Sequence, residues 1–280
     1  MKILIGTNTF GKYKRQDIAV DSYKHLKKVF PDVVDVLDVQ FRDEESTSKN
    51  HYKLDIIFDL TRSSHDYIED GEKKLPFVND ILRTLYEQSE DYFIFVNSDV
   101  IINPNLIEYI IENEPQCFPC SRLDIRDIDS FDKLKEQAQP VRWEIAGFDC
   151  FVFKREWYKE YYDLFNDYLL SRPRFDPVYA GIMKCFGDNT PIGNQYPPFC
   201  FHIHHANQWN NDSKETQFNI NAIENDDLDI FIDNMMFFNL KHNLTKREPW
   251  GAFLKPQPNE QLQEKIYFDN FNVHIPNEIR

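Results

Sequence analysis

Short β-rich runs alternate with segments of helical periodicity along roughly the first 120 residues, and this alternation constrains the fold more than any other feature. The β-rich runs are residues 2–6, 33–41, 54–60, 91–97 and 116–124. Apolar residues recur with helical spacing at 18–30, 75–89 and 104–113. Strands that alternate with helices predict an α/β fold with a mainly parallel, Rossmann-like central sheet flanked by helices.

The later part of the chain continues this pattern less regularly. Residues 150–153 predict a further strand, and 175–187 predict a helix. A strand within 196–209 runs out into a histidine-rich loop. The tail is rich in Asn and Asp, and its spacing predicts one helix around 227–242. We therefore expect one α/β domain followed by a C-terminal extension.

The charge balance limits the classes of partner. The chain carries 47 acidic and 32 basic residues, a formal net charge of −15, and has no basic stripe. This argues against a protein that binds the phosphate backbone of nucleic acid. No run approaches the roughly 20 apolar residues of a membrane span. The start, "MKILIGTNTF", is too short an apolar run for a signal peptide, so we expect a cytoplasmic protein.

The stretch "YFIFVNSDV" places Asp99 where a buried strand ends. An aspartate there either caps the following helix or holds a charge for chemistry. Asn103 fills the cap position better, directly before Pro104. In parallel sheets ligands bind beyond the carboxyl ends of strands, so Asp99 is a candidate ligand for a hard divalent ion.

The segment "HIHH" is a second candidate metal site. His202 and His204 share one face of a strand, and His205 points to the other face. A bend after Ile203 instead pairs His202 with His205. The three histidines therefore stay open as ligands.

Two further aspartates are candidates for chemistry. Asp149 follows Gly147 in "AGFDCF" and directly precedes a buried run. Asp176 precedes Pro177, an arrangement that also fits a helix start. The loop "GTNTFGKYKR" lacks the glycine patterns of dinucleotide-binding and P-loop folds, which counts against NAD and ATP.

The pattern "KLPFVNDIL…YFIFVNSDVII" resembles the nucleotide-sugar glycosyltransferases of the GT-A fold, with N-x-D in place of their D-x-D motif. The resemblance covers roughly residues 1–205. It implies a metal-dependent enzyme, using Mn²⁺ or Mg²⁺, that transfers a sugar from a nucleoside-diphosphate donor to a glycan acceptor in glycan or polysaccharide synthesis. Asp99 would hold the metal that bridges the diphosphate, with one of the late histidines, and Asn97 would contact the ribose or the metal shell.

The resemblance also implies roles for other residues. Asp149 and Asp176 are the candidate catalytic bases, with Asp176 preferred for an inverting enzyme. The loop after the first strand would pack on the nucleotide. The implied nucleotide-sugar contacts are Thr7, Asn8, Thr9, Arg15, Asp38, Lys74, Asn79, Asn97, Ser98 and Arg122.

These implications set the domain boundaries and the competing hypotheses. The glycosyltransferase-like domain would span 1–209, with a nucleotide-binding half at 1–124 and a sugar and acceptor half at 125–209. Residues 210–280 would form an extension packed on it, and its aromatic residues make homo-oligomers possible. The alternatives are a non-catalytic glycan-binding or scaffold relative, a sugar-nucleotide pyrophosphorylase, and a metal-dependent hydrolase built on Asp99 and the histidines.

Two other features have less functional weight. The "CFPC" pair, Cys117 and Cys120, would lie on opposite faces of a strand, which does not chelate a metal. Trp209 and Trp250 offer aromatic faces on which a sugar ring could stack.

Overall fold

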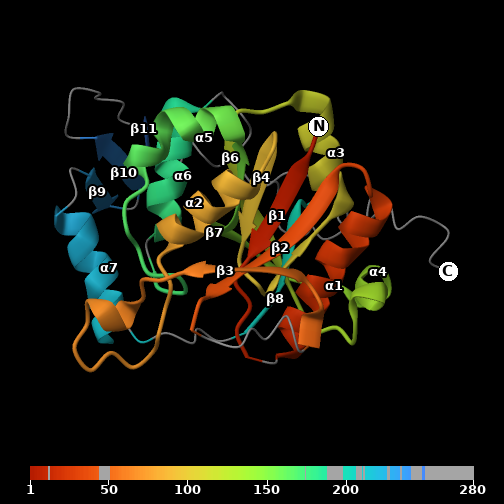
Figure 1. Ribbon diagram of the computed structural model, residues 1–280, viewed down its shortest axis with the longest axis horizontal. Coiled ribbons are helices and arrows are strands. Elements are labelled where there is room, and N and C mark those ends of the chain that lie inside the picture. Colours follow the sequence, from red (N-terminus) through yellow and green to blue (C-terminus); the bar gives the residue numbers. More distant parts are fainter. Residues whose placement is uncertain are drawn as a thin grey trace.

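The computed structural model shows a central sheet between two layers of helices (Figure 1). It describes residues 1–11, 13–43, 51–173, 175–187, 198–205, 210, 212–225, 228–233, 235–240 and 248–249.

The main sheet has eight strands in the order β3-β2-β1-β4-β7-β6-β8-β5. The strands β1 to β4 are mutually parallel, β7 and β5 run in the opposite direction, and β6 and β8 run with the first group. Their bounds are β1 Ile3–Thr7, β2 Val34–Phe41, β3 Asp55–Leu60, β4 Tyr92–Val96, β5 Val100–Ile102, β6 Cys117–Ile125, β7 Pro140–Lys154 and β8 Cys200–Ile203. The predicted α/β architecture with a mainly parallel central sheet is confirmed.

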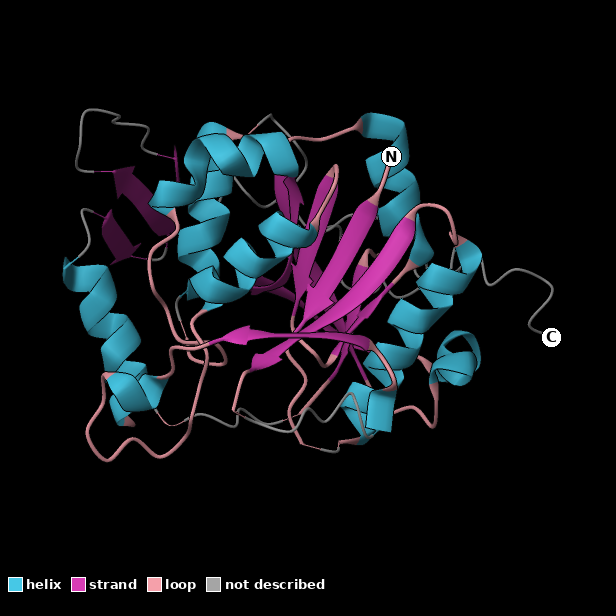
Figure 2. Ribbon diagram, viewed as in Figure 1, coloured by secondary structure: helices cyan, strands magenta, loops and turns pink. Residues whose placement is uncertain are grey.

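Helices cover both faces of this sheet (Figure 2). One face, called the α1 face here, is covered by α1 (Lys14–Val29), α3 (Pro104–Asn113) and α4 (Leu134–Gln137). The other, the α2 face, is covered by α2 (Val78–Gln88), α5 (Arg155–Tyr161) and α6 (Phe175–Phe186). Short 3-10 turns at Ser64–Asp66, Phe131–Lys133 and Tyr162–Leu164 connect these elements.

The alternation of side chains along β4 shows why the sheet is buried on both faces. Tyr92, Ile94 and Val96 pack on the α1 face. Phe93 and Phe95, which alternate with them, pack on the α2 face. On that second face Phe93 stacks on Phe153 of β7, with ring centroids 4.8 Å apart. All five residues of β4 are buried, as expected for a central strand flanked by helices on both sides.

The structure corrects several element assignments. Residues 100–102, for which no element was predicted from the sequence, form β5 at the sheet edge because they pair with β8. The strand predicted at 150–153 is the end of the much longer β7. The helix predicted around 227–242 is wrong: β9 (Leu228–Asp233) and β10 (Met235–Leu240) pair antiparallel there, with β11 (Glu248–Pro249) beside them. Leu228, Ile230 and Ile232 stand at every second position, which favours a strand.

A helix that the sequence reading missed, α7 (Lys214–Asn225), packs against the main body. Asn219 is buried and bonds the backbone of Leu169 in both directions, at 2.8 and 3.1 Å. Glu215 is also buried and accepts a hydrogen bond from the backbone N–H of Lys73 at 3.0 Å. The helix is docked by these polar side chains and by Phe218, whose ring centroid lies 5.9 Å from that of Phe77. A docking face of this mixed kind has no long apolar stripe, which explains why periodicity did not reveal the helix. Within the described residues, no helix is both long and apolar enough to cross a membrane.

Candidate metal and nucleotide-sugar site

Asp99 lies in the turn that joins β4 to β5. The turn is closed by a hydrogen bond of 3.1 Å from the N–H of Val100 to the carbonyl of Asn97. The strand β5 then pairs antiparallel with β8, and Val100 is opposite His202. This pairing brings the end of "FVNSDV" beside the start of "HIHH", although the two segments are about 100 residues apart in the chain.

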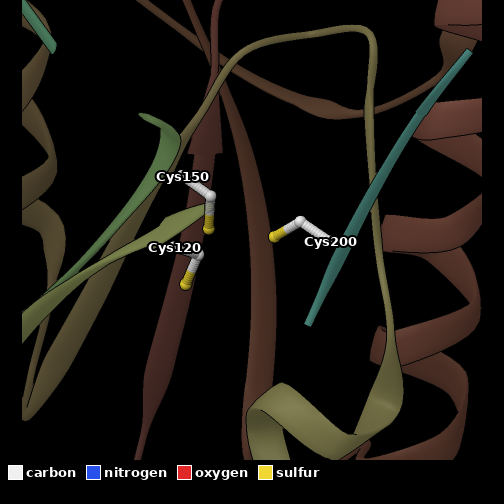
Figure 3. Close-up of side chains that lie close together, drawn as sticks. All are labelled: Cys120, Cys150 and Cys200. Carbon is white, nitrogen blue, oxygen red and sulfur yellow. The ribbon is translucent and has the colours of Figure 1, made fainter. Parts of the chain in front are cut away.

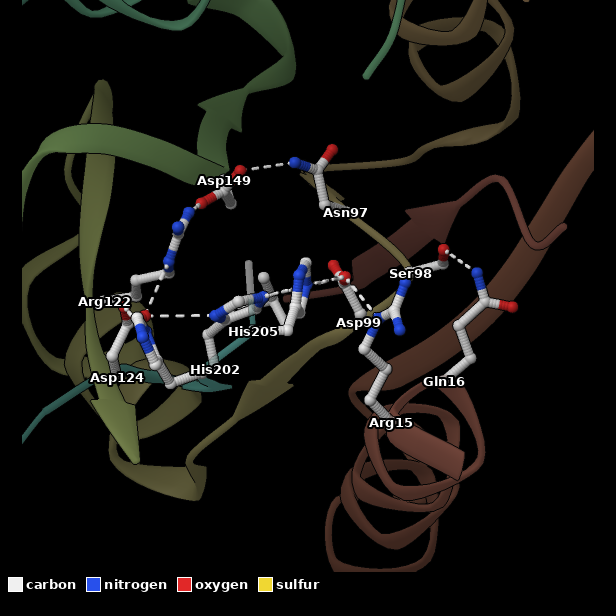
Figure 4. Close-up of polar contacts among 12 residues, drawn as sticks. Arg15, Gln16, Asn97, Ser98, Asp99, Arg122, Asp124, Asp149, His202 and His205 are labelled. Atoms are coloured by element: carbon white, nitrogen blue, oxygen red, sulfur yellow. Dashed lines mark hydrogen bonds and ion pairs between the residues drawn. The ribbon is translucent and has the colours of Figure 1, made fainter. Parts of the chain in front are cut away.

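One carboxylate and two imidazoles meet at this point (Figure 4). The Nε2 atoms of His202 and His205 lie 3.7 and 3.4 Å from Asp99 Oδ2. The two Nε2 atoms are 3.2 Å apart, and the three potential ligand atoms all lie within 4.8 Å of one another. An oxygen and two imidazole nitrogens at this spacing fit a single divalent ion such as Mn²⁺.

His202 and His205 lie together, which is the arrangement predicted for a bend after Ile203. The strand β8 ends at Ile203, and His205 then turns back toward His202. His204 is drawn away, because its Nδ1 lies 3.1 Å from Asp124 Oδ2. The structure therefore groups His202 and His205 with Asp99, and it does not place His204 in that group.

Arg15, in the first turn of α1, provides a positive charge at the same place. Its Nε donates to Asp99 Oδ2 at 3.2 Å, and its guanidinium lies 4.8 Å from the centroid of the Tyr13 ring. The side chains of Arg15 and Asp99 are 15% and 19% exposed, so the ion pair is only partly shielded from solvent. A metal ion would compete with Arg15 for the carboxylate of Asp99, and a diphosphate would compete with Asp99 for the guanidinium of Arg15.

The protonation of the group follows from its surroundings. Burial raises the pKa of Asp99, but hydrogen bonds from His202 and His205 and the charge of Arg15 outweigh it, so the pKa lies well below its usual range. Burial lowers the pKa of His202, whereas hydrogen bonds to Asp124 and Asp99 raise it above its ordinary value. The carboxylate is thus ionised, and its negative charge is available to a bound cation.

Asp124 is a site residue that the sequence reading missed. Its carboxylate is 1% exposed and accepts hydrogen bonds from Nδ1 of His202 at 3.0 Å and from Nε of Arg122 at 3.1 Å. A carboxylate on Nδ1 fixes the histidine tautomer whose Nε2 is free to bind a metal. The available signal was the alternation in "SRLD", which puts Arg122 and Asp124 on one face of a strand.

Replacing Asp124 with asparagine is expected to weaken Mn²⁺ binding by roughly 10- to 100-fold. The amide no longer holds Nδ1 of His202 as a charged acceptor, so the ligand loses its orientation and some of its basicity. Titration of the protein with Mn²⁺, followed by electron paramagnetic resonance, measures the change. The matched control is Asp127→Asn, since Asp127 is 67% exposed and pairs with Lys14. Equal affinities in the two variants would contradict this role.

The network continues from Arg122 to the first part of the motif. Arg122 Nη1 forms an ion pair with Asp149 Oδ2, and Asn97 Nδ2 donates a hydrogen bond to Asp149 Oδ1. The Oδ1 atom of Asn97 is buried and has no hydrogen-bond partner among the described residues. Asn97 thus orients Asp149, and it retains one unpaired acceptor for a ligand hydroxyl or amine.

Asp176 reaches the same edge of the sheet from the first turn of α6. Its Oδ2 accepts a hydrogen bond of 3.2 Å from the N–H of Phe148, the residue before Asp149. Neither candidate base stands alone, but their partners differ. Asp149 faces a guanidinium that neutralises its charge, whereas Asp176 receives a backbone N–H.

A second polar group lies beyond the carboxyl end of β1, beside the second half of β2. Thr9 donates to Asp38 through its backbone N–H at 2.9 Å and its hydroxyl at 2.7 Å, and Gln40 Nε2 donates to Asp38 Oδ1 at 2.9 Å. Asn8 Nδ2 donates to the carbonyl of Val39 at 2.7 Å. Thr7 is fully buried, and its hydroxyl has no partner among the described residues. The loop predicted to receive the nucleotide is therefore built around a buried carboxylate.

The remaining predicted contacts have other neighbours. Ser98 accepts a hydrogen bond of 2.7 Å from Gln16 of α1. Lys74 pairs with Asp43 at 2.7 Å and lies over the ring of Phe41. Asn79 lies 3.5 Å from Asp167.

Asn103 occupies the N-cap position of α3, but its side chain does not cap the helix. It donates instead to the carbonyl of Pro198 at 2.9 Å, which ties α3 to the segment leading into β8. Trp209, Trp250 and Pro177 lie outside the residues whose side chains the structure describes.

Comparisons with known proteins give structural neighbours only. No family model matches the chain, and no curated protein does. Among solved structures, S. aureus TarS 1-349 in complex with UDP-GlcNAc is 15% identical, with a TM-score of 0.46, over 74% of this chain and 59% of that chain. The galactosyltransferase LgtC, in complex with donor and acceptor sugar analogs, is 10% identical, with a TM-score of 0.36, over 94% of this chain and 100% of that chain.

A third neighbour, the inositol-1-phosphate CTP transferase from T. maritima, is 12% identical, with a TM-score of 0.32. It is matched over 80% of this chain and 97% of its own length. This chain thus spans less than two thirds of the TarS chain that it matches, and what each neighbour binds is a property of that neighbour.

Proposed function

We propose that this protein is a metal-dependent glycosyltransferase that moves a sugar from a nucleoside-diphosphate donor to an acceptor hydroxyl. The observation that carries the proposal is the meeting of Asp99, His202, His205 and Arg15 where β4 ends, on the same edge as the polar loop after β1. Beyond the carboxyl ends of parallel strands is where such sheets bind nucleotides.

The donor diphosphate is assigned to the Asp99 group. A divalent ion, Mn²⁺ or Mg²⁺, would be held by Asp99 with His202 and His205, and would supply positive charge to the diphosphate as it leaves. Arg15 would exchange its contact with Asp99 for the diphosphate oxygens, since a guanidinium binds phosphate with two parallel hydrogen bonds. Asp124 keeps His202 oriented throughout.

The nucleoside and the sugar are assigned to the groups on either side. The nucleoside would lie against Thr9 and Asp38, where a buried carboxylate can accept hydrogen bonds from a base or ribose. The donor sugar would lie against Asp149, which Asn97 and Arg122 hold in place. Asp176 is assigned the removal of the proton from the acceptor hydroxyl, since it lies in the first turn of α6 and its carboxylate is bonded to the backbone of Phe148, beside Asp149.

A thermal-unfolding series tests this function directly. UDP and GDP are each added with Mn²⁺, with Mg²⁺, and with EDTA. A nucleotide at 100 times its Kd stabilises the folded protein by roughly 2.7 kcal/mol, so a clear rise in Tm is expected with metal and its loss with EDTA. Absence of any rise with either nucleotide would overturn the proposal.

The set of two histidines and one aspartate also favours a second candidate, a metal-dependent hydrolase. Catalytic zinc ions are commonly held by two histidines and a carboxylate, with a water in the open position. For that function Zn²⁺ alone would raise the Tm, and UDP or GDP would add nothing. Adding Zn²⁺ to the series, with and without nucleotide, therefore separates the two candidates.

Release of free sugar or transfer product from the nucleotide-sugar that binds best then distinguishes a working enzyme from a non-catalytic relative. A pyrophosphorylase would instead form nucleotide-sugar from a nucleoside triphosphate and a sugar phosphate. Each of these outcomes is measured on the same purified chain.

A further inference from the structure

Three cysteines from three strands meet inside the sheet. Cys120 of β6, Cys150 of β7 and Cys200 of β8 are 3%, 0% and 0% exposed. Their sulfur atoms all lie within 4.8 Å of one another. Figure 3 shows the three thiols pointing into a common space from their separate strands. The sequence reading weighed Cys120 only with Cys117 and did not find this group.

The sheet topology explains the meeting. The strands β7, β6 and β8 are consecutive neighbours in the sheet, and Cys120 pairs directly with Cys150 across β6 and β7. All three cysteines pack on the α1 face. Cys117, on the same strand as Cys120, packs on the α2 face, as predicted for residues an odd number apart.

The electrostatics of the group are uneven. Burial raises the pKa of Cys120 and of Cys150 well above the ordinary value of a thiol. Burial also acts on Cys200, but hydrogen bonds from the other two thiols and the charge of Arg122 overcome it and lower the pKa of Cys200.

We propose that Cys120, Cys150 and Cys200 form a binding site for one soft metal cation of the Cu(I) class. Thiolate sulfur selects soft ions, and the group offers no oxygen or nitrogen ligand. Metal–sulfur bonds of about 2.3 Å place three sulfurs about 4 Å apart around one ion. This separation is compatible with the three sulfurs, which all lie within 4.8 Å of one another.

The number of ligands separates Cu(I) from Zn²⁺. Structural zinc takes four ligands in a tetrahedron. Among the residues that the structure describes, the cluster contains three potential ligands and no histidine, aspartate or glutamate as a fourth. Three-coordinate geometry suits Cu(I). Binding releases thiol protons to solvent and involves no change of oxidation state, because the metal is supplied as Cu(I). This site does not depend on the proposed transferase function.

The test uses the reduced full chain without oxygen. A chromogenic Cu(I) chelator is loaded with Cu(I), and the protein is added in steps. We expect the chain to withdraw one Cu(I) per molecule, and X-ray absorption to show three sulfur neighbours at one distance. Failure to withdraw copper, or coordination by nitrogen, overturns the proposal and leaves the cysteines as core packing.

Two substitutions locate the site. Cys200→Ser is expected to weaken Cu(I) binding by more than the roughly 100-fold that loss of an outer-shell partner costs. The matched control is Cys117→Ser, which removes an equally buried thiol, 2% exposed, from the opposite face of β6. If Cys200→Ser and Cys117→Ser bind Cu(I) with the same affinity, the proposal is wrong.

Two control measurements show whether a variant that loses copper is still folded. The metal-free Tm and far-UV circular dichroism are recorded for each variant, and Cys200→Ala repeats the experiment without a buried hydroxyl. Asp99→Asn is included as a test of the histidine site: it should retain the copper, and loss of the copper there would assign the metal to His202 and His205 instead.

Discussion

Replacing Asp99 with asparagine is expected to abolish the rise in Tm that UDP or GDP produces with Mn²⁺. The substitution keeps the volume of the side chain but removes the only carboxylate in the metal group of Asp99, His202 and His205. Loss of an outer-shell partner typically costs 10- to 100-fold in metal affinity, so loss of this ligand is expected to cost more than about 100-fold. Transferase activity should fall with it.

The same change also affects the protein without metal. Arg15 loses its ion pair with Asp99, and because the Arg15 side chain is only 15% exposed, some stability is lost as well. The Tm without ligand is therefore measured first, and the ligand-induced rise is compared with that baseline. Asp127→Asn serves as the control, since its carboxylate is exposed and pairs with Lys14. A normal rise with Mn²⁺ in the Asp99 variant would remove this residue from the metal site.

Arg15 offers a further distinction. In the absence of a metal its guanidinium holds Asp99, at 3.2 Å. If UDP or GDP stabilises the wild type equally with EDTA and with Mn²⁺, the cation at the diphosphate is Arg15 rather than a metal. Arg15→Gln then removes the stabilisation, whereas Asp99→Asn leaves it in place.

The alternation of strands and helices was sufficient to predict the central sheet and the place where Asp99 lies. Both depend on local patterns, since a buried strand reads as a continuous apolar run and its polar end marks the sheet edge. The pairing of β5 with β8 was not available from such patterns. Val100, Ile101 and Ile102 continue an apolar run, and only their long-range partner shows that they form a strand.

The residues that sequence reasoning missed are those whose role depends on strand order. Asp124 lies in β6, and nothing in its local sequence marks it. It contacts His202 because β8 pairs with β6 and places His202 opposite Asp124. Cys120, Cys150 and Cys200 are far apart in the chain and meet because β7, β6 and β8 are adjacent. Residue type and spacing alone do not reveal such neighbours, since register and order are set by the whole sheet.

Replacing Asp176 with asparagine is expected to lower the turnover of the bound nucleotide-sugar by roughly 10²- to 10⁴-fold, the usual contribution of a general base. The fold should persist, because the amide oxygen of asparagine still accepts the hydrogen bond from the N–H of Phe148. The metal-dependent rise in Tm should also be unchanged, because Asp176 does not belong to the Asp99 group.

Two variants complete this test. Asp163→Asn changes an exposed carboxylate in the 3-10 turn Tyr162–Leu164, and the turnover of this variant should match that of the wild type. Asp149→Asn is expected to weaken donor binding, seen as a higher KM, since Asp149 is held by Arg122 and Asn97 for contact with the sugar. If instead Asp149→Asn lowers kcat by the larger factor while Asp176→Asn stays within 10-fold of wild type, the base is Asp149. In that case Arg122 must release the carboxylate when the acceptor binds, because a base has to exchange its ion-pair partner for the proton that it removes.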